Sequence, residues 1–320
     1  MHNGSMCKSY TMSGDGVAGR RTEGYSSGVR WLKEPGVFNG ELEVEASCDG
    51  KGVLAGPNDG KLIVAGDKAL LIVKGGGEFT LQNIEVDGDL IIHLPSGGVT
   101  LLNSVKVAGT TLVIAGDPMA ATGAEGLEVN NSGQSVLSFR SCAEHGEEII
   151  LLQSQLLHVH LEGDASFSEV AVHLSGPLSL SGGYGNVLVS PTASRLRLRL
   201  EEGAVIGGAL KLMAPGICLN AQGGSIFDLW NDPHYPLSGE AASLAEDASA
   251  RLYDINGSRN AEEMGLALAG AGIFAKSTEE VELLLNRIQM DSCSSLTEVK
   301  ECLEMYRMTK PHALSPSGVL

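Results

Sequence analysis

The chain has 320 residues, of which 43% are hydrophobic, only 4% are aromatic and 42 residues are glycine, and its formal net charge is −17. This composition predicts a folded protein with many tight turns and a core of Val, Leu, Ile and Ala, and it does not suit a helical bundle. The negative charge argues against nucleic acid as a partner, because binding phosphates depends on Lys and Arg side chains that replace counterions.

The sequence also favours a particular compartment. Its six cysteines form no CxxC pair and no compact cluster, so neither a zinc module nor a disulfide framework is expected. The first fifteen residues lack the apolar region of a signal peptide, and nowhere do eighteen apolar residues run together. We therefore expect a cytoplasmic protein without a membrane span.

Two regions come first along the chain. Residues 1–35 mix Gly, Ser and Arg without hydrophobic periodicity, which predicts a flexible arm. From residue 36 to residue 235, short apolar or alternating runs are separated by glycine-bearing turns, a pattern typical of β-strands.

The strands recur at a spacing of about twenty residues. Three apolar triplets begin at Leu71, Leu90 and Leu112, at similar intervals along the chain. Units of this size cannot bury their own apolar face, so we expect them to stack as a parallel β-helix over 36–235. A β-sandwich is the alternative, but it does not explain why equivalent residues return at one spacing.

A short motif repeats inside this region, because Thr80-Leu-x-Asn83 recurs as Thr100-Leu-x-Asn103. In a parallel β-helix, each strand pairs with its equivalent one coil later, about 4.8 Å away. We therefore predict that Asn83 stacks on Asn103 in a structural ladder, at a turn where Asn tolerates a left-handed backbone.

After Trp230 the pattern becomes helical, and we assign residues 236–310 to a helical cap or docking segment, followed by a tail at 311–320. Two helices are expected at 278–290 and 296–308, each preceded by the S-x-x-E pattern of a capping box.

These helices suit the end of a solenoid, where unpaired backbone needs a cover. The first of the two carries an apolar stripe. We interpret the stripe as core packing, and a docking surface for a partner is the alternative. The stripe consists of Val281, Leu284, Leu285 and Ile288.

Catalytic residues are not expected. Parallel β-helices of the pectate-lyase type are often polysaccharide lyases or glycosidases, which need clustered carboxylates. The Asn-Thr-Asp, Gly-Asp-Asp and Gly-His-Gly elements of the polygalacturonase branch do not occur here. Asp87 and Asp89 are the strongest carboxylate pair, but they flank a glycine in a turn, where Asp is common for structural reasons. We predict neither a catalytic residue nor a cofactor.

A metal site is not expected either. His158 and His160 lie on one face of a predicted strand, and His173 follows further along the chain. Metal ligation needs a third ligand on an adjacent coil, which this spacing does not demand.

The candidate binding residues are Arg195, Arg197 and Arg199, which alternate with leucines. Alternation places the leucines in the core and the three guanidinium groups on one outer face. Such a row suits a carboxylate-rich partner segment or an acidic glycan, because arginine pairs with carboxylates through two parallel hydrogen bonds. The alternative is an outer strand whose arginines are neutralised by Glu201 and Glu202.

Two stretches resemble one known family. "PGVFNGE" at 35–41 is similar to the "PGTYNGE" element that opens the β-helix of the SHC-binding, spindle-associated proteins, whose fly relative is nessun dorma. "GGYGNVLVSPT" at 182–192 resembles "EGYGVVLVKPT" near the end of the same domain. The resemblance implies a right-handed, pectin-lyase-like β-helix in a divergent or truncated member, since the family's long N-terminal domain has no counterpart in the sequence.

The resemblance also implies a role in cytokinesis. Members associate with the centralspindlin kinesin complex and with contractile-ring proteins at the spindle midzone, the midbody and ring canals, and the fly member is credited with galactoside binding. We therefore expect a non-catalytic β-helix scaffold that binds such protein partners, with a glycan as a further ligand. The alternative is a carbohydrate-active lyase or glycoside hydrolase.

Overall fold

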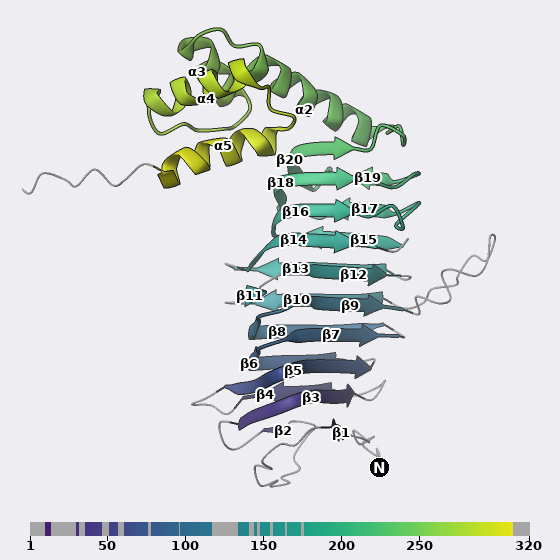
Figure 1. Ribbon diagram of the computed structural model, residues 1–320. Coiled ribbons are helices and arrows are strands. Elements are labelled where there is room, and N and C mark those ends of the chain that lie inside the picture. The colour runs from purple at the N-terminus through teal and green to yellow at the C-terminus, as the bar shows by residue number, and fades with distance from the viewer. Residues whose placement is uncertain are drawn as a thin grey trace, which may run out of the picture.

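The structure is a computed structural model and is drawn in Figure 1. It describes residues 10–13, 30–31, 36–46, 51–56, 61–75, 78–95, 97–116, 134–140, 144–145, 148–153, 156–163, 165–173 and 176–309. Within the arm predicted at 1–35, the described parts are the strands β1 (Tyr10–Ser13) and β2 (Arg30–Trp31). The rest of that arm and the predicted tail at 311–320 lie outside the described residues.

The body of the molecule is a stack of parallel strands, as the recurring apolar runs predict (Figure 1). Among the described strands, only β1 runs antiparallel to its partner, the strand β3. The strands of the body are β3 (Gly36–Ala46), β4 (Lys51–Ala55), β5 (Leu62–Gly75), β6 (Glu78–Val86), β7 (Asp89–Leu94), β8 (Gly98–Val107), β9 (Thr111–Ala115), β10 (Gln134–Arg140), β11 (Glu144–His145), β12 (Ile149–Gln153), β13 (Leu156–Glu162), β14 (Ser166–Val172), β15 (Pro177–Ser181), β16 (Gly183–Val189), β17 (Arg197–Leu200), β18 (Ala204–Leu212), β19 (Cys218–Asn220) and β20 (Gly224–Asn231).

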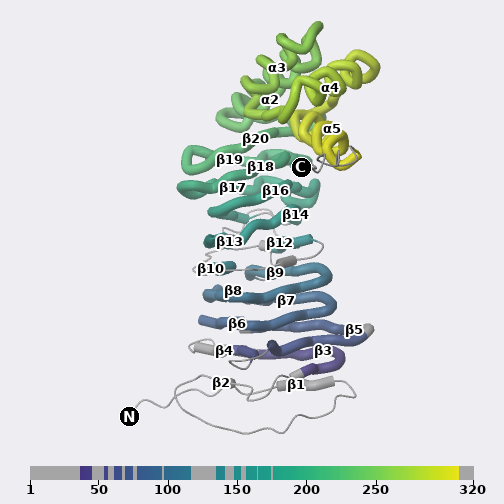
Figure 2. Tube along the Cα trace, turned by 90° about the vertical axis from the view of Figure 1, so that its left-hand side faces the viewer, coloured from purple at the N-terminus to yellow at the C-terminus, as the bar shows by residue number. Residues whose placement is uncertain are grey.

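The strands of the stack form three walls. Several strands bend at a corner residue and so belong to two walls. In β3 the register shifts at Gly40, whose φ of 104° suits glycine, so the strand serves one wall before this residue and another wall after it. Figure 2 shows the coils stacked one above another, with the C-terminal helices beyond the last strand, β20. The first wall runs from residues 36–39 to residues 224–226, the second from 41–46 to 228–231, and the third from 51–55 to 218–220.

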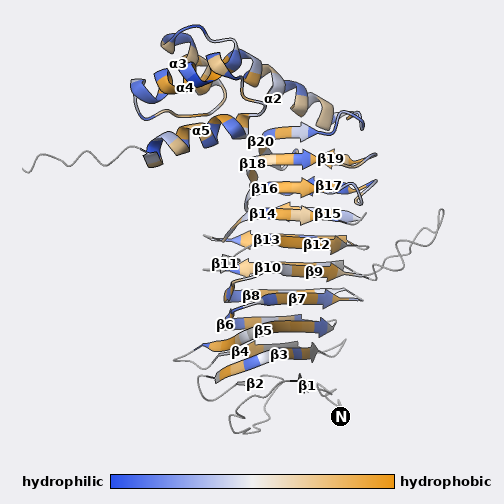
Figure 3. Ribbon diagram, viewed as in Figure 1, coloured by the Kyte–Doolittle hydropathy of each residue, from blue (hydrophilic) through white to orange (hydrophobic). Residues whose placement is uncertain are grey.

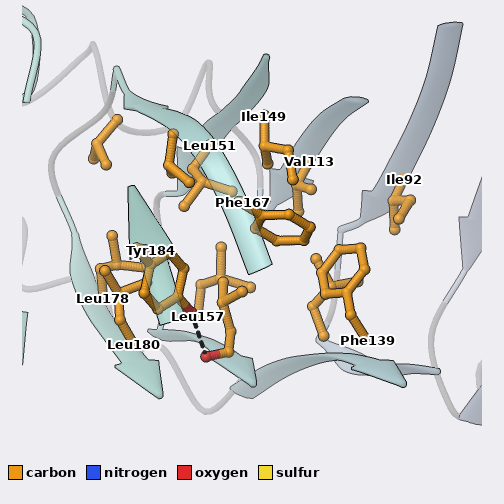
Figure 4. Packing of buried hydrophobic residues seen from close by; sticks show 14 of the residues in the cluster. Ile92, Val113, Phe139, Ile149, Leu151, Leu157, Phe167, Leu178, Leu180 and Tyr184 are labelled. Atoms are coloured by element: carbon orange, nitrogen blue, oxygen red, sulfur yellow. Dashed lines mark hydrogen bonds between the residues drawn. The ribbon is translucent and has the colours of Figure 1, made fainter. Parts of the chain in front are cut away.

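The core lies inside these walls, because alternate residues of a strand point to opposite sides. The inward residues form one cluster that is almost entirely aliphatic, and part of it is drawn in Figure 4. The rings of Phe139 and Phe167 meet edge to face with centroids 4.6 Å apart. The hydroxyl of Tyr184 donates to the carbonyl of Val159 at 3.1 Å, and burial raises the pKa of this phenol.

The predicted stacking of Asn83 on Asn103 is wrong by one residue. The register of β6 and β8 pairs Gln82 with Asn103 and Ile84 with Val105, so Asn83 is level with the residue after Asn103, Ser104. Both corner residues have a left-handed backbone, with φ of 54° for Asn83 and 55° for Ser104, as expected for a turn that Asn tolerates.

The motif that suggested the ladder is out of step with the coils. By the motif Leu81 corresponds to Leu101, whereas in the structure Leu81 pairs with Leu102. A slip of one residue moves each side chain to the other face of a strand. Leu81 and Leu102 are accordingly fully buried, while Leu101 lies on the outside and is partly exposed. The structural repeat is therefore the pattern of buried residues, and the repeated Thr-Leu-x-Asn motif is shifted from it by one residue.

Four helices follow the solenoid (Figure 1). They are α2 (Glu240–Asn256), α3 (Ala261–Gly270), α4 (Thr278–Met290) and α5 (Leu296–Thr309). The serine half of each predicted capping box is formed: the hydroxyls of Ser277 and Ser295 accept hydrogen bonds from the backbone of Glu280 and Glu298, at 3.2 and 3.1 Å. The glutamate side chains reach back one residue further than predicted and accept from the backbone of Lys276 and Ser294. The predicted apolar stripe on α4 packs into the helical core, which confirms the core interpretation.

The helices close the C-terminal end of the solenoid. Ala241 of α2 belongs to the solenoid core, and Leu237, Leu244 and Ala245 pack against it. The prediction of a mainly β, right-handed parallel β-helix with a C-terminal helical cap is thus confirmed. Within the described part of the chain, no helix combines the length and the hydrophobicity needed to cross a membrane.

A candidate ligand groove on the third wall

An open groove of about 340 Å³ crosses the outer surface of the third wall near the helical cap. It spans four successive strands, β13, β15, β17 and β19, which pair in parallel one above another. Leu156 and Pro177 contribute apolar surface, whereas Leu178 and Leu198 border the groove but are buried in the core. The polar and charged residues that line the groove are His158, Ser179, Arg197, Arg199, Glu201 and Asn220.

Register brings these residues together. His158 pairs with Ser179, Ser179 with Arg199, and Arg199 with Asn220, so the four side chains form one row across the wall. Neighbouring strands lie about 4.8 Å apart, so the row presents its polar groups along roughly 14 Å. Arg197 lies in the neighbouring row of the same wall.

The arginine stretch has the alternation that the sequence predicts. Leu196, Leu198 and Leu200 are buried, whereas all three arginines are exposed. Arg197 and Arg199 line the groove, but Arg195 does not, because it precedes β17 in a turn and has a φ of 62°.

The two groove arginines differ in their partners. Arg199 forms an ion pair with Glu201, with Nε 3.3 Å from Oε1, and the hydroxyl of Ser179 donates to the same carboxylate oxygen. The guanidinium of Arg197 makes no hydrogen bond or ion pair with any residue that the structure describes. The alternative interpretation, neutralisation of the row by acidic neighbours, therefore holds for Arg199 through Glu201, whereas Arg197 has no such partner among the described residues.

The histidines of this wall form a stacked pair. The rings of His158 and His160 lie 6.0 Å apart and nearly parallel, and Nδ1 of His160 lies 2.7 Å from the hydroxyl of Ser181. Burial, the neighbouring His160 and the cation of Arg199 lower the pKa of His158, against an opposing effect of Glu201.

His173 lies just after the end of β14, whereas the histidine pair lies on β13. Among the described residues, no group of three or more His, Cys, Asp or Glu side chains could hold a metal ion.

The carboxylates Asp87 and Asp89 lie outside the groove, at the corner between β6 and β7. Oδ1 of Asp89 accepts a hydrogen bond from the backbone of Thr110 one coil later, at 2.8 Å. Asn186 repeats this contact with the backbone of Ala209 at 2.9 Å. Such a bond satisfies a donor at the corner, so Asp89 has a structural role, as its place in a glycine turn suggests.

Sequence reasoning missed Ser179, Asn220 and the role of Glu201 as a shared hydrogen-bond acceptor in the groove. A signal for them was present, because His158, Ser179, Arg199 and Asn220 follow one another at nearly equal intervals. Each interval equals one coil, so polar residues that recur with it belong to one row.

Comparisons of the chain with protein-family models, with curated proteins and with solved structures found no match.

Proposed function

We propose that this protein is a non-catalytic β-helix scaffold that binds a carboxylate-rich, extended segment of a protein partner in the groove of the third wall. The observation that carries the proposal is the free guanidinium of Arg197 beside Arg199, in a chain with a net charge of −17. An unpaired guanidinium beside a second arginine in such an acidic protein is suited to an acidic ligand.

The geometry favours an extended ligand. Arg197 and Arg199 are alternate residues of β17, so their side chains leave the wall about 6.8 Å apart. Alternate side chains of an extended peptide have the same spacing, and each carboxylate can accept two parallel hydrogen bonds from one guanidinium. Asn220 adds an amide to the same row as Arg199.

The groove lacks the residues that hydrolysis of a glycosidic bond requires. Glycosidases use two carboxylates, one as an acid and one as a base or nucleophile. Among the described residues that line the groove, Glu201 is the one carboxylate, and Ser179 and Arg199 already engage it. These contacts support binding over catalysis by a lyase or glycosidase.

The family resemblance suggests which partners to test. By that resemblance, the acidic segment belongs to the centralspindlin complex or to a contractile-ring protein, and the site of action is the spindle midzone, the midbody or a ring canal. A galactoside is the second candidate ligand, because Arg199 and Asn220 offer exposed hydrogen-bonding groups in one row.

A paired charge reversal tests the proposal. The probe is a labelled extended peptide with Glu at alternate positions, and a peptide with Gln at those positions is its control. We expect Arg197→Glu/Arg199→Glu to abolish binding of the Glu peptide. The matched variant Arg195→Glu/Arg259→Glu makes the same change in net charge outside the groove, and it should bind nearly as well as the wild type.

Equal losses in the two variants would show a general charge effect and overturn the proposed site. Affinity capture from dividing cells, with the full chain and the same two variants, tests the partner class. Recovery of no spindle or ring protein by the wild type would contradict the cytokinesis role. If galactose displaces the captured partner and the Glu peptide does not, the result would favour the glycan as the ligand.

A further inference from the structure

The outer surface of the second wall carries aliphatic residues where a solvated sheet normally carries polar ones. They occupy equivalent positions of successive strands, from β5 to β16, and pair in register. Figure 3 shows hydrophobic colour along β5, β9 and β12, where inward and outward residues are both apolar. We call these residues the aliphatic row, and they are Ile72, Ile91, Leu112, Ile150, Ala171 and Leu188.

The row is partly exposed. Each member except Ala171, which its neighbours cover, keeps part of its side chain accessible, and none of the six belongs to the solenoid core. Ile114 and Leu152 lie two residues beyond Leu112 and Ile150 on the same side and widen the row at its centre. The result is a continuous apolar strip along the axis of the solenoid.

Carboxylates border one side of the strip. Asp89, Glu148 and Glu169 each lie two residues before a member of the row, and therefore project from the same surface. Asp89 is engaged at its corner, but the side chains of Glu148 and Glu169 have no hydrogen bond or ion pair with any described residue. The opposite border has no described carboxylate level with the row, and it includes Lys74 and His93.

The length and width of the strip indicate what kind of partner can bind to it. Five steps of about 4.8 Å make it about 24 Å long, and it is only one or two side chains wide. Its area is a few hundred Å², well below the roughly 800 Å² that each partner buries in a stable complex of standard size. A second copy of the chain is also a poor occupant, because both copies carry a charge of −17.

We propose that the aliphatic row binds one basic amphipathic α-helix of a partner protein. A helix of about 16 residues covers 24 Å, and its turns, about 5.4 Å apart, approximately follow the rungs of the row. Aliphatic residues at intervals of three and four face the row, and Lys or Arg residues on one flank meet Glu148 and Glu169.

The test measures binding of a labelled helical peptide, long enough to span the row, to the full chain by fluorescence anisotropy. The peptide carries Leu at positions spaced three and four apart and Lys on one flank, and a second peptide has Gln in place of Lys. We expect the Lys peptide to bind more tightly. Leu112→Thr/Ile150→Thr, which keeps strand-forming side chains on an outward surface, should weaken binding of both peptides at least tenfold.

The acidic border is tested separately. Glu148→Gln/Glu169→Gln should weaken binding of the Lys peptide about tenfold, which corresponds to two exposed ion pairs, and leave the Gln peptide unaffected. The control Glu202→Gln/Glu246→Gln makes the same charge change elsewhere and should alter binding less than twofold.

Three results would overturn the proposal: no binding of the Lys peptide, an equal loss in the control, or a dimer in sedimentation velocity that Leu112→Thr/Ile150→Thr abolishes. The last result would assign the row to a second copy of the chain. If the threonine variant does not fold, the Gln variants decide the question.

Discussion

The solenoid and its helical cap are stabilised in different ways. The inward residues of the solenoid are almost all aliphatic and recur at each coil, so its stability is distributed over many similar contacts. The cap depends on a few directional contacts instead. The two carboxylate residues that are buried among the described residues, Asp228 and Glu280, both serve it. The solenoid core thus tolerates exchange of one aliphatic residue for another, whereas the placement of the cap depends on single polar side chains.

Asp228 illustrates the second mode. It lies on the last strand, β20, and its carboxylate accepts hydrogen bonds from the backbone and the hydroxyl of Thr297, at 3.0 and 2.9 Å. It therefore satisfies donors in the first turn of α5 from a position 69 residues earlier in the chain. Lys300 of the same helix reaches the carbonyl of Gly207 at 2.8 Å and lies over the ring of Phe227.

The largest expected effect comes from removing a core ring of the solenoid. Phe139 is fully buried and contacts Phe167, so Phe139→Ala should lower the free energy of unfolding by about 3–5 kcal/mol. Val136→Ala, on the outer surface of the same strand, is the control and should cost less than about 1 kcal/mol. Urea unfolding followed by circular dichroism measures both values. Equal effects would show that β10 is not packed as described.

Asp228→Ala should have the next largest effect and should act on the cap. It removes a buried carboxylate that accepts two hydrogen bonds, a loss of about 2–3 kcal/mol. Hydrogen exchange should increase in α5 while the strands β7 and β9 keep their protection. Asp228→Asn retains an acceptor and should show a smaller change. Faster exchange throughout the solenoid would mean that the cap is needed for the whole stack.

Acid should loosen the cap through Glu280. The side chain of Arg307 donates to this carboxylate at 3.0 Å and, with the backbone of Lys276, lowers the pKa of Glu280 from its usual 4.5. A carboxyl with a lowered pKa in the folded state stabilises the protein above its usual pKa, and this contribution disappears as the pH falls through the lowered value. Exchange in α4 and α5 should therefore increase below about pH 4.5.

Glu280→Gln serves as the test of this assignment. The variant loses the charge but keeps an acceptor, so at pH 7 it should cost about 1–2 kcal/mol. It should also remove part of the acid sensitivity of α4 and α5. An unchanged pH profile in the variant would assign the effect to Glu298, whose pKa is lowered by hydrogen bonds from Ser294.

The same contrast explains what the sequence can predict. Alternation at positions such as Arg197 and Leu198 depends only on neighbours in the chain, and so does the helix cap at Ser277. Register depends on the length of every connection. Leu112 pairs with Ile91 on one side and with Ile150 on the other. The connection from Leu112 to Ile150 is much longer than the connection from Ile91 to Leu112. The row of groove residues and the bond from Asp228 to Thr297 arise from such pairings, and local patterns do not report them.

The smallest expected effect on stability comes from the arginine side chains at 195–199, which contribute little to the aliphatic core of the solenoid or to the polar contacts of the cap. Arg195, Arg197 and Arg199 are exposed, and one ion pair, from Arg199 to Glu201, links them to other described side chains. An exposed ion pair contributes about 0–1 kcal/mol, so reversal of all three charges to Glu should change the free energy of unfolding by no more than about 1 kcal/mol. Urea unfolding at low and at physiological salt measures this. A loss several times larger would mean that the stretch stabilises the fold, and a loss of peptide binding in the variant would then say nothing about recognition.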